Sequence, residues 1–408
     1  MDILEFLPQL LKNKKIILGV CGSVAIYKSL ELIRILQKLG ANVRVVLSQS
    51  AQEFINPLLF EAISKNKVLT KESQSWDSTN ALNHIEITDA DAFIIAPASV
   101  NSINKIACGI CDTILLESFI AFDKIKLLAP AANTKMLKNS ITQENLKKLK
   151  NLGVKIIRPQ VKELACGIVG NGALAEPLEI AFNIIKALLK DSFFKDKSIL
   201  ITAGGSKEAI DSVRYISNYS SGKMGYALAL CAYFLGAKTT LISPTLPFNL
   251  PLEINYKKAE SSKEFLENIK NWQKDLKDSA LSYLFMSAAI SDYVPEKIAD
   301  KKLKKQEIGK EWNLKLKQNL DILKSIEKNQ NTIGFKLESS QNAESLAKTA
   351  LEKKGLNAIC LNRISDNFNP LDSNQNEITF ITKDSSILLP LSDKITLSFK
   401  ILQEVKKL

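Results

Sequence analysis

One thiol and one imidazole stand out among the side chains of this sequence that could do chemistry. Cys166 lies in "ELACGIVGNGALAEP" (163–177), where recurring glycines let the chain bend close to a ligand while packing little themselves. His84, in "NHIEIT", is the only histidine of the 408 residues, so imidazole chemistry within one chain must use it. The alternatives are that Cys166 contacts no ligand and that His84 has only a structural role.

Polar side chains also follow two apolar runs. "DAFIIAPAS" is typical of a strand and leads to Ser99 and Asn101, and "IKLLAPAANTKML" is typical of a strand that leads to Asn133. Strand ends that combine small residues with hydroxyl and amide groups suit a flat ring that must approach the backbone closely. The alternative is that these are ordinary turns, in which Ser or Asn caps the next helix.

The elements that position these residues follow one pattern twice. A β-branched run over 14–20 precedes apolar residues at helical spacing, a stop at Gly40 and a second strand over 42–48. A strand over 197–205, a helix from about Gly222 and a strand over 237–243 repeat this order. Parallel strands need crossover helices, so the pattern predicts an α/β fold with two doubly wound, Rossmann-like domains that bind ligands at the carboxyl ends of their strands.

Length and composition limit the possible classes of protein. With 408 residues, 46% of them hydrophobic and 24% charged, the chain is expected to form two globular domains that divide between residues 190 and 191. The net charge of +12 comes largely from scattered lysines, which disfavours nucleic-acid binding, and no apolar run reaches membrane-spanning length. We therefore expect a cytosolic protein whose six cysteines are free thiols. Cys108-x-x-Cys111 lacks the further ligands of a metal site.

Together these segments resemble a known family. "GVCGSVAIYKSLELIR", "NHIEIT", "IIAPASVN", "APAANTKM" and the Cys166 segment are similar in order and spacing to the flavin-containing cysteine decarboxylases, in particular the decarboxylase half of the bifunctional coenzyme A biosynthesis enzymes. The second half resembles the partner ligase through "ITAGGSKEAIDSVRYISNYSSGKMGYALA", "SAAISDYVP", "KKLKK" and "IGFKLES". The resemblance implies a flavodoxin-like phosphopantothenoylcysteine decarboxylase domain over 1–190 and a Rossmann-like phosphopantothenate–cysteine ligase domain over 191–408.

For the first domain the resemblance implies FMN as the cofactor. The flavin oxidises the cysteinyl side chain of the substrate, so that sulfur accepts the electrons left by loss of CO2. By the same resemblance Cys166 donates a proton to the product, His84 assists the oxidation and Asn133 holds the substrate carboxylate. FMN contacts are implied for Gly22, Ser23, Ser48, Ser99 and Asn101, and a substrate contact is implied for Met136.

For the second domain the resemblance implies activation of 4'-phosphopantothenate by CTP with Mg2+, release of pyrophosphate and transfer of the acyl group from the cytidylate to L-cysteine. Asn218 would stabilise the acyl-cytidylate and Arg214 would bind an anionic part of a substrate. As an alternative, Asn218 would only cap the next helix. The run "KIADKKLKK", otherwise a solvated loop, would be a mobile flap over the triphosphate. CTP contacts are implied for Ala288, Ala289, Asp292, Lys302, Asn319, Asp321, Phe335, Lys348 and either Lys353 or Lys354.

The chain departs from the family pattern at four positions. Ala132 stands where Met is usual, Ala173 where Arg is usual, and Ser212 and Leu320 where Pro is expected. Loss of a guanidinium beside an anionic substrate would weaken its binding, so the alternative function is a flavin- and nucleotide-binding protein with an active ligase half and an impaired decarboxylase half. Apart from the resemblance, a non-catalytic flavoprotein or a nucleotide-binding regulator is the competing class. The family also implies a homo-oligomer with dimeric ligase domains and trimeric decarboxylase domains.

Overall fold

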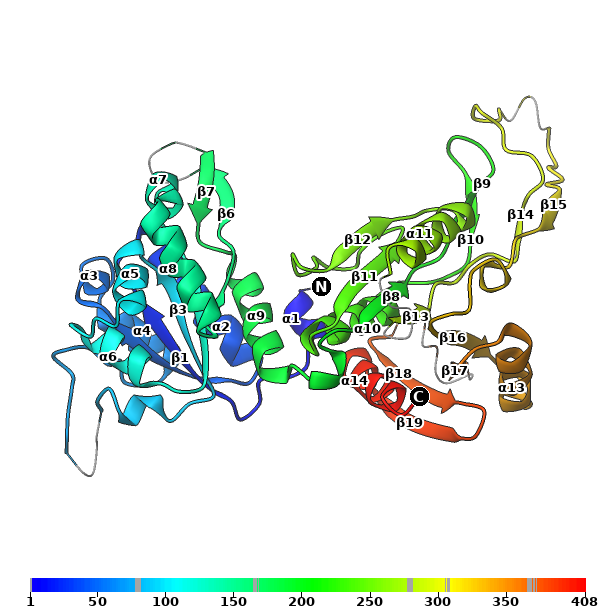
Figure 1. The fold of residues 1–408 in the computed structure, drawn as a ribbon. Helices are drawn as coiled ribbons and strands as arrows, with labels where there is room; N and C mark the ends of the chain where they lie inside the picture. The colour runs from blue at the N-terminus through cyan, green and yellow to red at the C-terminus, as the bar shows by residue number, and fades with distance from the viewer. Residues whose placement is uncertain are drawn as a thin grey trace. The chain divides into compact units, whose positions relative to one another are not determined.

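The computed structural model describes residues 2–77, 82–163, 167, 169–276, 282–304, 306, 309–364, 369, 371 and 373–408. Contacts within the described chain divide it into two compact units (Figure 1). The first unit lies within residues 9–189, and the second combines residues 2–8 with residues from 190 onward. Both are α/β domains built on parallel strands, which confirms the predicted fold class.

A five-stranded parallel sheet in the order β2-β1-β3-β4-β5 forms the centre of the first unit. On its interior strand β1, Ile16, Ile17 and Leu18 are all buried. Because neighbours along a strand point to opposite faces, both faces of this sheet are covered. The strands are β1 (Lys15–Val20), β2 (Asn42–Leu47), β3 (Ala92–Ala98), β4 (Ile125–Pro130) and β5 (Lys155–Ile156).

Helices connect these strands. They are η1 (Val24–Ile26), α2 (Tyr27–Lys38), α3 (Gln49–Gln52), α4 (Pro57–Ser64), η2 (Glu86–Thr88), α5 (Val100–Ala107), α6 (Ile114–Ala121), α7 (Thr134–Lys138), α8 (Ser140–Asn151) and α9 (Pro177–Leu189). α2 buries its apolar stripe and is followed by Gly40, whose φ of 94° lies in the left-handed region that favours glycine. α2 packs against α4 and α9, whereas α5 packs against α6 and α8.

An antiparallel hairpin of β6 (Gln160–Glu163) and β7 (Val169–Ala173) precedes α9. Its anchor is Glu176, which pairs with Lys28 of α2 at 3.1 Å and with Lys162 of β6. Burial alone would raise the pKa of Glu176, but the hydrogen bonds from Lys162 and Lys28 lower it below its usual value. The carboxylate therefore stays charged at neutral pH and joins the hairpin to α2.

An eight-stranded sheet in the order β12-β11-β8-β13-β16-β17-β18-β19 forms the second unit. The ladder is parallel from β12 to β17, while β18 and β19 add an antiparallel hairpin that the sequence pattern did not predict. The strands are β8 (Ser198–Thr202), β11 (Lys238–Ser243), β12 (Asn255–Lys258), β13 (Ser282–Met286), β16 (Asn331–Glu338), β17 (Ala358–Arg363), β18 (Gln375–Ile381) and β19 (Ser386–Asp393).

Two further antiparallel hairpins extend from this sheet, drawn in green and in yellow in Figure 1. One consists of β9 (Lys207–Ala209) and β10 (Tyr215–Ser217), and the other of β14 (Tyr293–Pro295) and β15 (Leu316–Gln318). β9 and β14 contact each other, so the two hairpins lie side by side.

A fully buried helix lies at the core of the second unit. α10 (Lys223–Phe234) is buried at every residue from Gly225 to Phe234, because α14 covers the face that the sheet does not. The helices of this unit are α1 (Ile3–Phe6), η3 (Ser192–Phe194), α10, α11 (Ser262–Lys274), η5 (Ile322–Lys324), α13 (Ala343–Lys354) and α14 (Lys394–Val405).

The N-terminal segment belongs to the second unit. The ring centroid of Phe6, at the end of α1, lies 6.1 Å from that of Tyr226 and 5.2 Å from that of Phe248. The expected division assigned residues 1–190 to one domain, so the structure differs from it at the N-terminus. Within the described residues, no helix is long and apolar enough to cross a membrane.

Candidate functional site

Four neighbouring strands of the first unit end in a side chain that caps the next helix. After β1, β2 and β3, the hydroxyls of Ser23, Ser48 and Ser99 accept hydrogen bonds of 3.2 Å from backbone N–H groups two or three residues further on. After β4, Oδ1 of Asn133 accepts one of 2.9 Å from the Lys135 N–H. Ser99 and Asn133 therefore cap the next helices, as the alternative predicted, while their ligand contacts stay predictions. The four caps bring helix N-termini, which favour anions, to one edge of the sheet.

Gly22 lies at the same edge, where the chain after β2 passes closely. A Cβ at this position would lie 2.7 Å from Oγ and 2.8 Å from the backbone oxygen of Ser50, so only glycine fits. Asn101 is exposed in the first turn of α5, and Met136 is exposed on α7. The predicted FMN residues thus surround one strand-end region, with Met136 on the helix beside it.

The β6–β7 hairpin contacts this region at two of the unusual positions. The N–H of Ala132 donates to the carbonyl of Gly172 at 3.0 Å, and Ala173 pairs with Gln160 across the hairpin. The departures from the family pattern at Ala132 and Ala173 therefore lie where the hairpin meets the loop before α7. Within the described residues, the buried atoms Thr134 Oγ1 and Gln160 Oε1 have no hydrogen-bond partner here. Unpartnered buried polar atoms are costly unless a ligand or water binds them.

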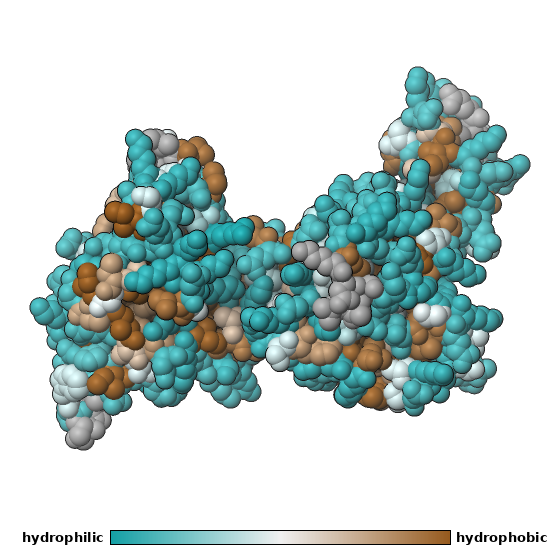
Figure 2. All heavy atoms as spheres, in the orientation of Figure 1, coloured by the Kyte–Doolittle hydropathy of each residue, from teal (hydrophilic) through white to brown (hydrophobic). Residues whose placement is uncertain are grey.

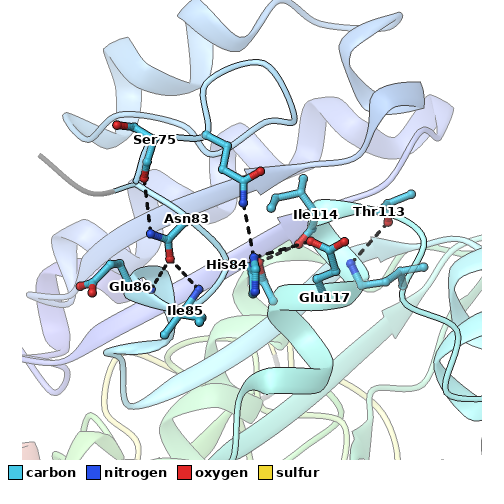
Figure 3. Close-up of polar contacts among 11 residues, drawn as sticks. Ser75, Asn83, His84, Ile85, Glu86, Thr113, Ile114 and Glu117 are labelled. Carbon is cyan, nitrogen blue, oxygen red and sulfur yellow. Dashed lines mark hydrogen bonds and ion pairs between the residues drawn. The ribbon is translucent and has the colours of Figure 1, made fainter. Parts of the chain in front are cut away.

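His84 lies in the loop before β3 and faces α6 (Figure 3). Its Nδ1 is 3.6 Å from Oε2 of Glu117 and 3.4 Å from Nε2 of Gln74. The ring of Trp76 packs edge-on against the imidazole, with 5.6 Å between the two ring centroids. These partners lie on the Nδ1 side of the ring, and the assisting role of His84 stays a prediction.

Asn83 fixes the backbone beside His84. Its Oδ1 accepts hydrogen bonds from the N–H groups of Ile85 at 2.9 Å and Glu86 at 3.0 Å, at the start of η2 (Figure 3). The side chain is buried, so the loop geometry around the histidine is set from inside the unit.

Cys166 lies outside the described residues. Gly167, which follows it, has a φ of 75°, a backbone conformation that favours glycine. The proton-donor role of Cys166 stays a prediction.

The second unit contains one large cavity, of about 910 Å3, at the carboxyl ends of its parallel strands. Four segments that hold predicted residues meet there: the chain before α10, the chain after β13, the chain after β15, and β16. Of the predicted residues, the cavity is lined by Asn218, Ala288, Ala289, Asp292, Asn319, Asp321 and Phe335. Ligands of open α/β sheets bind at this position in the fold.

Hydrogen bonds hold the polar side chains of the cavity wall. Nδ2 of Asn319 donates to the carbonyl of Ser291 at 2.7 Å, and Nδ2 of Asn218 donates to the carbonyl of Ile290 at 3.2 Å. Ser291 is buried, and its Oγ has no partner among the described residues. An unpartnered hydroxyl in the wall favours a bound ligand.

The structure contradicts the alternative that Asn218 caps the next helix. The N-cap of α10 is Gly222, not Asn218. Instead, the carbonyl of Asn218 passes so close to Gly205 that a Cβ there would lie 2.5 Å from it. Gly205, in the predicted "TAGGS" turn, thus allows the Asn218 loop to lie against the end of β8.

Basic side chains outnumber acidic ones in the cavity wall. Lys223, Lys336, Lys354 and Lys394 line it, against Asp292 and Asp321. Lys354 Nζ lies 3.6 Å from Oδ2 of Asp321, whereas Lys348 and Lys353 are exposed on α13 and do not line the cavity. Of the lysines suggested for α13, the geometry therefore favours Lys354.

Arg214 and Lys302 also lie away from the cavity wall. Arg214 Nη1 is 3.3 Å from Oδ2 of Asp211, and its Nη2 donates to the carbonyl of Leu303 at 3.2 Å. Lys302 is exposed on the loop between β14 and β15. The predicted anion-binding role of Arg214 stays a prediction, because its described partners are protein groups.

Cys108 and Cys111 are exposed free thiols. Within the part of the chain that the structure describes, no group of three or more His, Cys, Asp or Glu side chains is arranged to hold a metal ion.

Sequence reasoning missed several of these residues. Glu117 carries no local signal, because only the packing of α6 brings it to His84. Asp211 lies within the quoted motif, three residues before Arg214, and this spacing was the available signal. Lys223 also lies within the quoted motif, whereas Lys394 begins a helix with no sequence signal that distinguishes it from a surface lysine.

Comparison with known proteins agrees with this geometry. The model of the "Flavoprotein" family matches residues 6–189, and that of the "DNA/pantothenate metabolism flavoprotein C-terminal domain" matches residues 194–408. The coenzyme A biosynthesis bifunctional protein CoaBC of Vibrio parahaemolyticus is 38% identical over 98% of this chain and 100% of its own. The CoaBC protein of Bacillus subtilis is 35% identical over 98% of both chains. The solved C-terminal domain of a CoaBC protein is 32% identical, covers 53% of this chain and 97% of its own, and has a TM-score of 0.44.

A flavoprotein domain joined to a pantothenate-metabolism domain defines the class of this protein as a two-domain α/β enzyme. The chain belongs to the CoaBC family of bifunctional coenzyme A biosynthesis proteins. It is a phosphopantothenoylcysteine decarboxylase and a phosphopantothenate–cysteine ligase, which confirms the predicted function.

Proposed function

We propose that the first unit carries the decarboxylase reaction with FMN and that the second unit carries the ligase reaction with CTP, 4'-phosphopantothenate and L-cysteine. The observation that carries this proposal is the cavity of the second unit, where seven of the predicted nucleotide and catalytic positions meet. A volume of about 910 Å3 is adequate for a nucleotide together with a second small substrate.

In the ligase reaction a carboxylate oxygen of 4'-phosphopantothenate attacks the α-phosphorus of CTP, and the bond to pyrophosphate breaks. The amine of cysteine then attacks the acyl carbon, loses a proton and displaces CMP. The lysines of the cavity wall offset the negative charge of the triphosphate, and Mg2+ would accompany it, with no ligands assigned. The amide of Asn218 donates toward the charge that develops on the acyl-cytidylate.

In the decarboxylase reaction, FMN would supply, when bound, the oxidation of the cysteinyl side chain of the substrate and the later reduction of the decarboxylated product. Oδ1 of Asn133 is used by the Lys135 N–H, which orients the Nδ2 donor toward a substrate carboxylate. Glu117 beside Nδ1 favours the tautomer in which Nε2 of His84 accepts a proton. Cys166 would return a proton to the product, since a thiol is largely protonated at neutral pH.

The residues of the first unit fit a flavin phosphate and ring. The capped helix N-termini offer N–H groups to a phosphate, and the crowding at Gly22 keeps side chains away from the backbone there. Gly22, Ser23, Ser48, Ser99 and Asn101 would hold the cofactor at this edge. The unpartnered Thr134 and Gln160 oxygens offer further acceptors near Asn133.

A ligase with an impaired decarboxylase half is the second candidate. The specific observation in its favour is that Ala132 bonds to Gly172, the residue next to Ala173, so both departures lie at the base of the β6–β7 hairpin. Two large side chains of the family pattern are therefore replaced by methyl groups at one place.

Assembly and location stay predictions. The first unit exposes large apolar side chains, among them Phe54, Leu58, Trp76 and Ile85. Figure 2 shows hydrophobic areas on the face of the first unit seen in that view. Burial of such side chains between copies of the chain would support the expected homo-oligomer. The expected location is the cytosol.

The test combines colour with product analysis. The purified chain is expected to be yellow with a flavin absorbance spectrum, and to convert 4'-phosphopantothenate, cysteine, CTP and Mg2+ to 4'-phosphopantetheine, measured by mass. Product that stops at 4'-phosphopantothenoylcysteine supports the impaired-decarboxylase alternative. Absence of CTP-dependent pyrophosphate release contradicts the proposed ligase function.

A further inference from the structure

The tip of the β9–β10 hairpin contains a fully buried carboxylate. The side chain of Asp211 is 0% exposed, and its two oxygens have different partners. Oδ1 accepts hydrogen bonds of 2.8 Å from the N–H groups of Val213 and Arg214, which closes the turn of its own hairpin. Oδ2 accepts a bond of 3.2 Å from the N–H of Leu303, in the lysine-rich loop after β14.

Arg214 completes a closed arrangement around Leu303. Its guanidinium pairs with Oδ2 of Asp211 and donates to the Leu303 carbonyl, so both polar groups of the Leu303 backbone are bound by one acid–base pair. The guanidinium carbon also lies 5.2 Å from the ring centroid of Trp312, further along the same loop. We call Asp211, Arg214 and their bonds to Leu303 the latch.

The charge of Asp211 supports the latch in addition to its geometry. Burial alone would raise the pKa of Asp211, but the N–H groups of Val213, Arg214 and Leu303 and the charge of Arg214 lower it below its usual value. Asp211 is therefore ionised at neutral pH, and its hydrogen bond to the loop is charge-assisted.

The latched loop begins and ends at the cavity. Asp292 and Tyr293 line the cavity before the loop, and Gln318 and Asn319 line it after the loop. One residue before Leu303 lies Lys302, the residue expected to contact the triphosphate. On the other side of the latch, β10 leads directly to Asn218 in the cavity wall.

We propose that Asp211 is a positioning residue for the ligase reaction, which holds the 296–315 loop by the Leu303 backbone and so sets where Lys302 stands relative to the nucleotide. This inference rests on the proposed CTP-binding function of the second unit. It extends that function, because it gives the predicted flap a fixed point of attachment and gives Arg214 a role besides substrate binding.

The substitution Asp211→Asn should disrupt the latch while it keeps the turn of the hairpin. An asparagine Oδ1 can still accept from Val213 and Arg214, as asparagine does in many turns. Its NH2 group would then face the Leu303 N–H and the Arg214 guanidinium, both of which are donors, so the loop loses its attachment at Leu303 and keeps the backbone bond from the Ala299 N–H to the Ile210 carbonyl.

Trypsin digestion of the full chain measures loop release directly, because Lys301, Lys302 and Lys304 are cleavage sites within the latched segment. We expect Asp211→Asn to be cleaved there about tenfold faster than the parent, the factor that loss of one charge-assisted hydrogen bond implies. The KM for CTP should rise by a similar factor, with a smaller change in kcat. Asp300→Asn is the matched control, since it makes the same chemical change at an exposed position of the same loop and should leave all three values unchanged.

Parental trypsin sensitivity together with a parental KM for CTP in a folded Asp211→Asn protein would overturn the latch. If that variant does not fold, Trp312→Leu takes its place, since it removes the ring beside Arg214 and should shift both values in the same direction by a smaller factor. Unchanged values in Trp312→Leu would then overturn the inference.

Failure of the proposed function is a separate result. Lys302→Gln tests that function alone: it should raise the KM for CTP while leaving trypsin cleavage after Lys304 unchanged. If Lys302→Gln keeps the parental KM, the role of Lys302 is wrong, and the cleavage rate of Asp211→Asn still decides whether Asp211 holds the loop.

Discussion

The two units place their predicted residues in different ways. In the second unit, predicted residues from four distant segments meet in one cavity, and most of them line its wall directly. In the first unit the serines and Asn133 lie in a row as helix caps, while His84 sits in a loop with Gln74, Trp76 and Glu117 as its partners. A strand-end side chain can therefore be located from sequence, but its convergence with a distant loop depends on packing.

The proton-donor role of Cys166 is the sharpest test of the first unit. In Cys166→Ala, the chain should keep its flavin and still oxidise and decarboxylate the substrate, whereas formation of 4'-phosphopantetheine should fall by about 10²- to 10⁴-fold, the range for loss of a general acid. An oxidised product, two hydrogens short of 4'-phosphopantetheine, should accumulate in the mass spectrum. Normal product at the parental rate would make Cys166 a structural residue.

Asn218→Asp tests the second unit in the same way. A carboxylate would repel the charge on the acyl-cytidylate, so ligation should fall by about 10²- to 10³-fold while flavin absorbance is retained. Because Gly222 caps α10, the substitution brings no capping gain, and loss of the bond to the Ile290 carbonyl should cost about 1 kcal/mol of unfolding free energy. Parental ligation in a folded variant would leave Asn218 only its hydrogen bond to Ile290.

Phe6→Ala tests which unit the N-terminus stabilises. Phe6 is 4% exposed and packs against Tyr226 and Phe248, so its truncation should cost about 3 kcal/mol. Denaturant should then abolish ligation at a lower concentration, while flavin release from the first unit keeps its parental midpoint. Leu388→Ala, at an exposed position of the second unit, is the matched control. A shift in flavin release alone would assign α1 to the first unit.

Glu117→Gln should have the smallest effect. It keeps the shape of the side chain but removes the charge that favours the tautomer proposed for His84. Since the pair is partly exposed, we expect decarboxylation of supplied 4'-phosphopantothenoylcysteine to slow by about fivefold, with ligation unchanged. Glu86→Gln provides the control, because Glu86 is an exposed acid two residues after His84. An equal effect of both substitutions would remove the specific role of Glu117.

The sequence by itself determined the features that depend on near neighbours. Apolar spacing predicted β1, α2 and β2, and again β8, α10 and β11, because periods of 2 and 3.6 residues are local properties of the chain. The polar residues after β1 to β4 were located for the same reason, since parallel strands bring their carboxyl ends to one edge. The motifs that carry the family resemblance were also local.

Only the tertiary structure decided which distant segments meet. It placed Glu117 beside His84, joined Asp211 to Leu303, brought Lys354 to the cavity and assigned α1 to the second unit. It also added the antiparallel β18 and β19 hairpin to a sheet that the pattern predicted as parallel. Apart from the pairing of β18 with β19, each of these contacts joins residues far apart in the chain, and its stability comes from burial and charge pairing in the folded domain, which no short stretch of sequence contains.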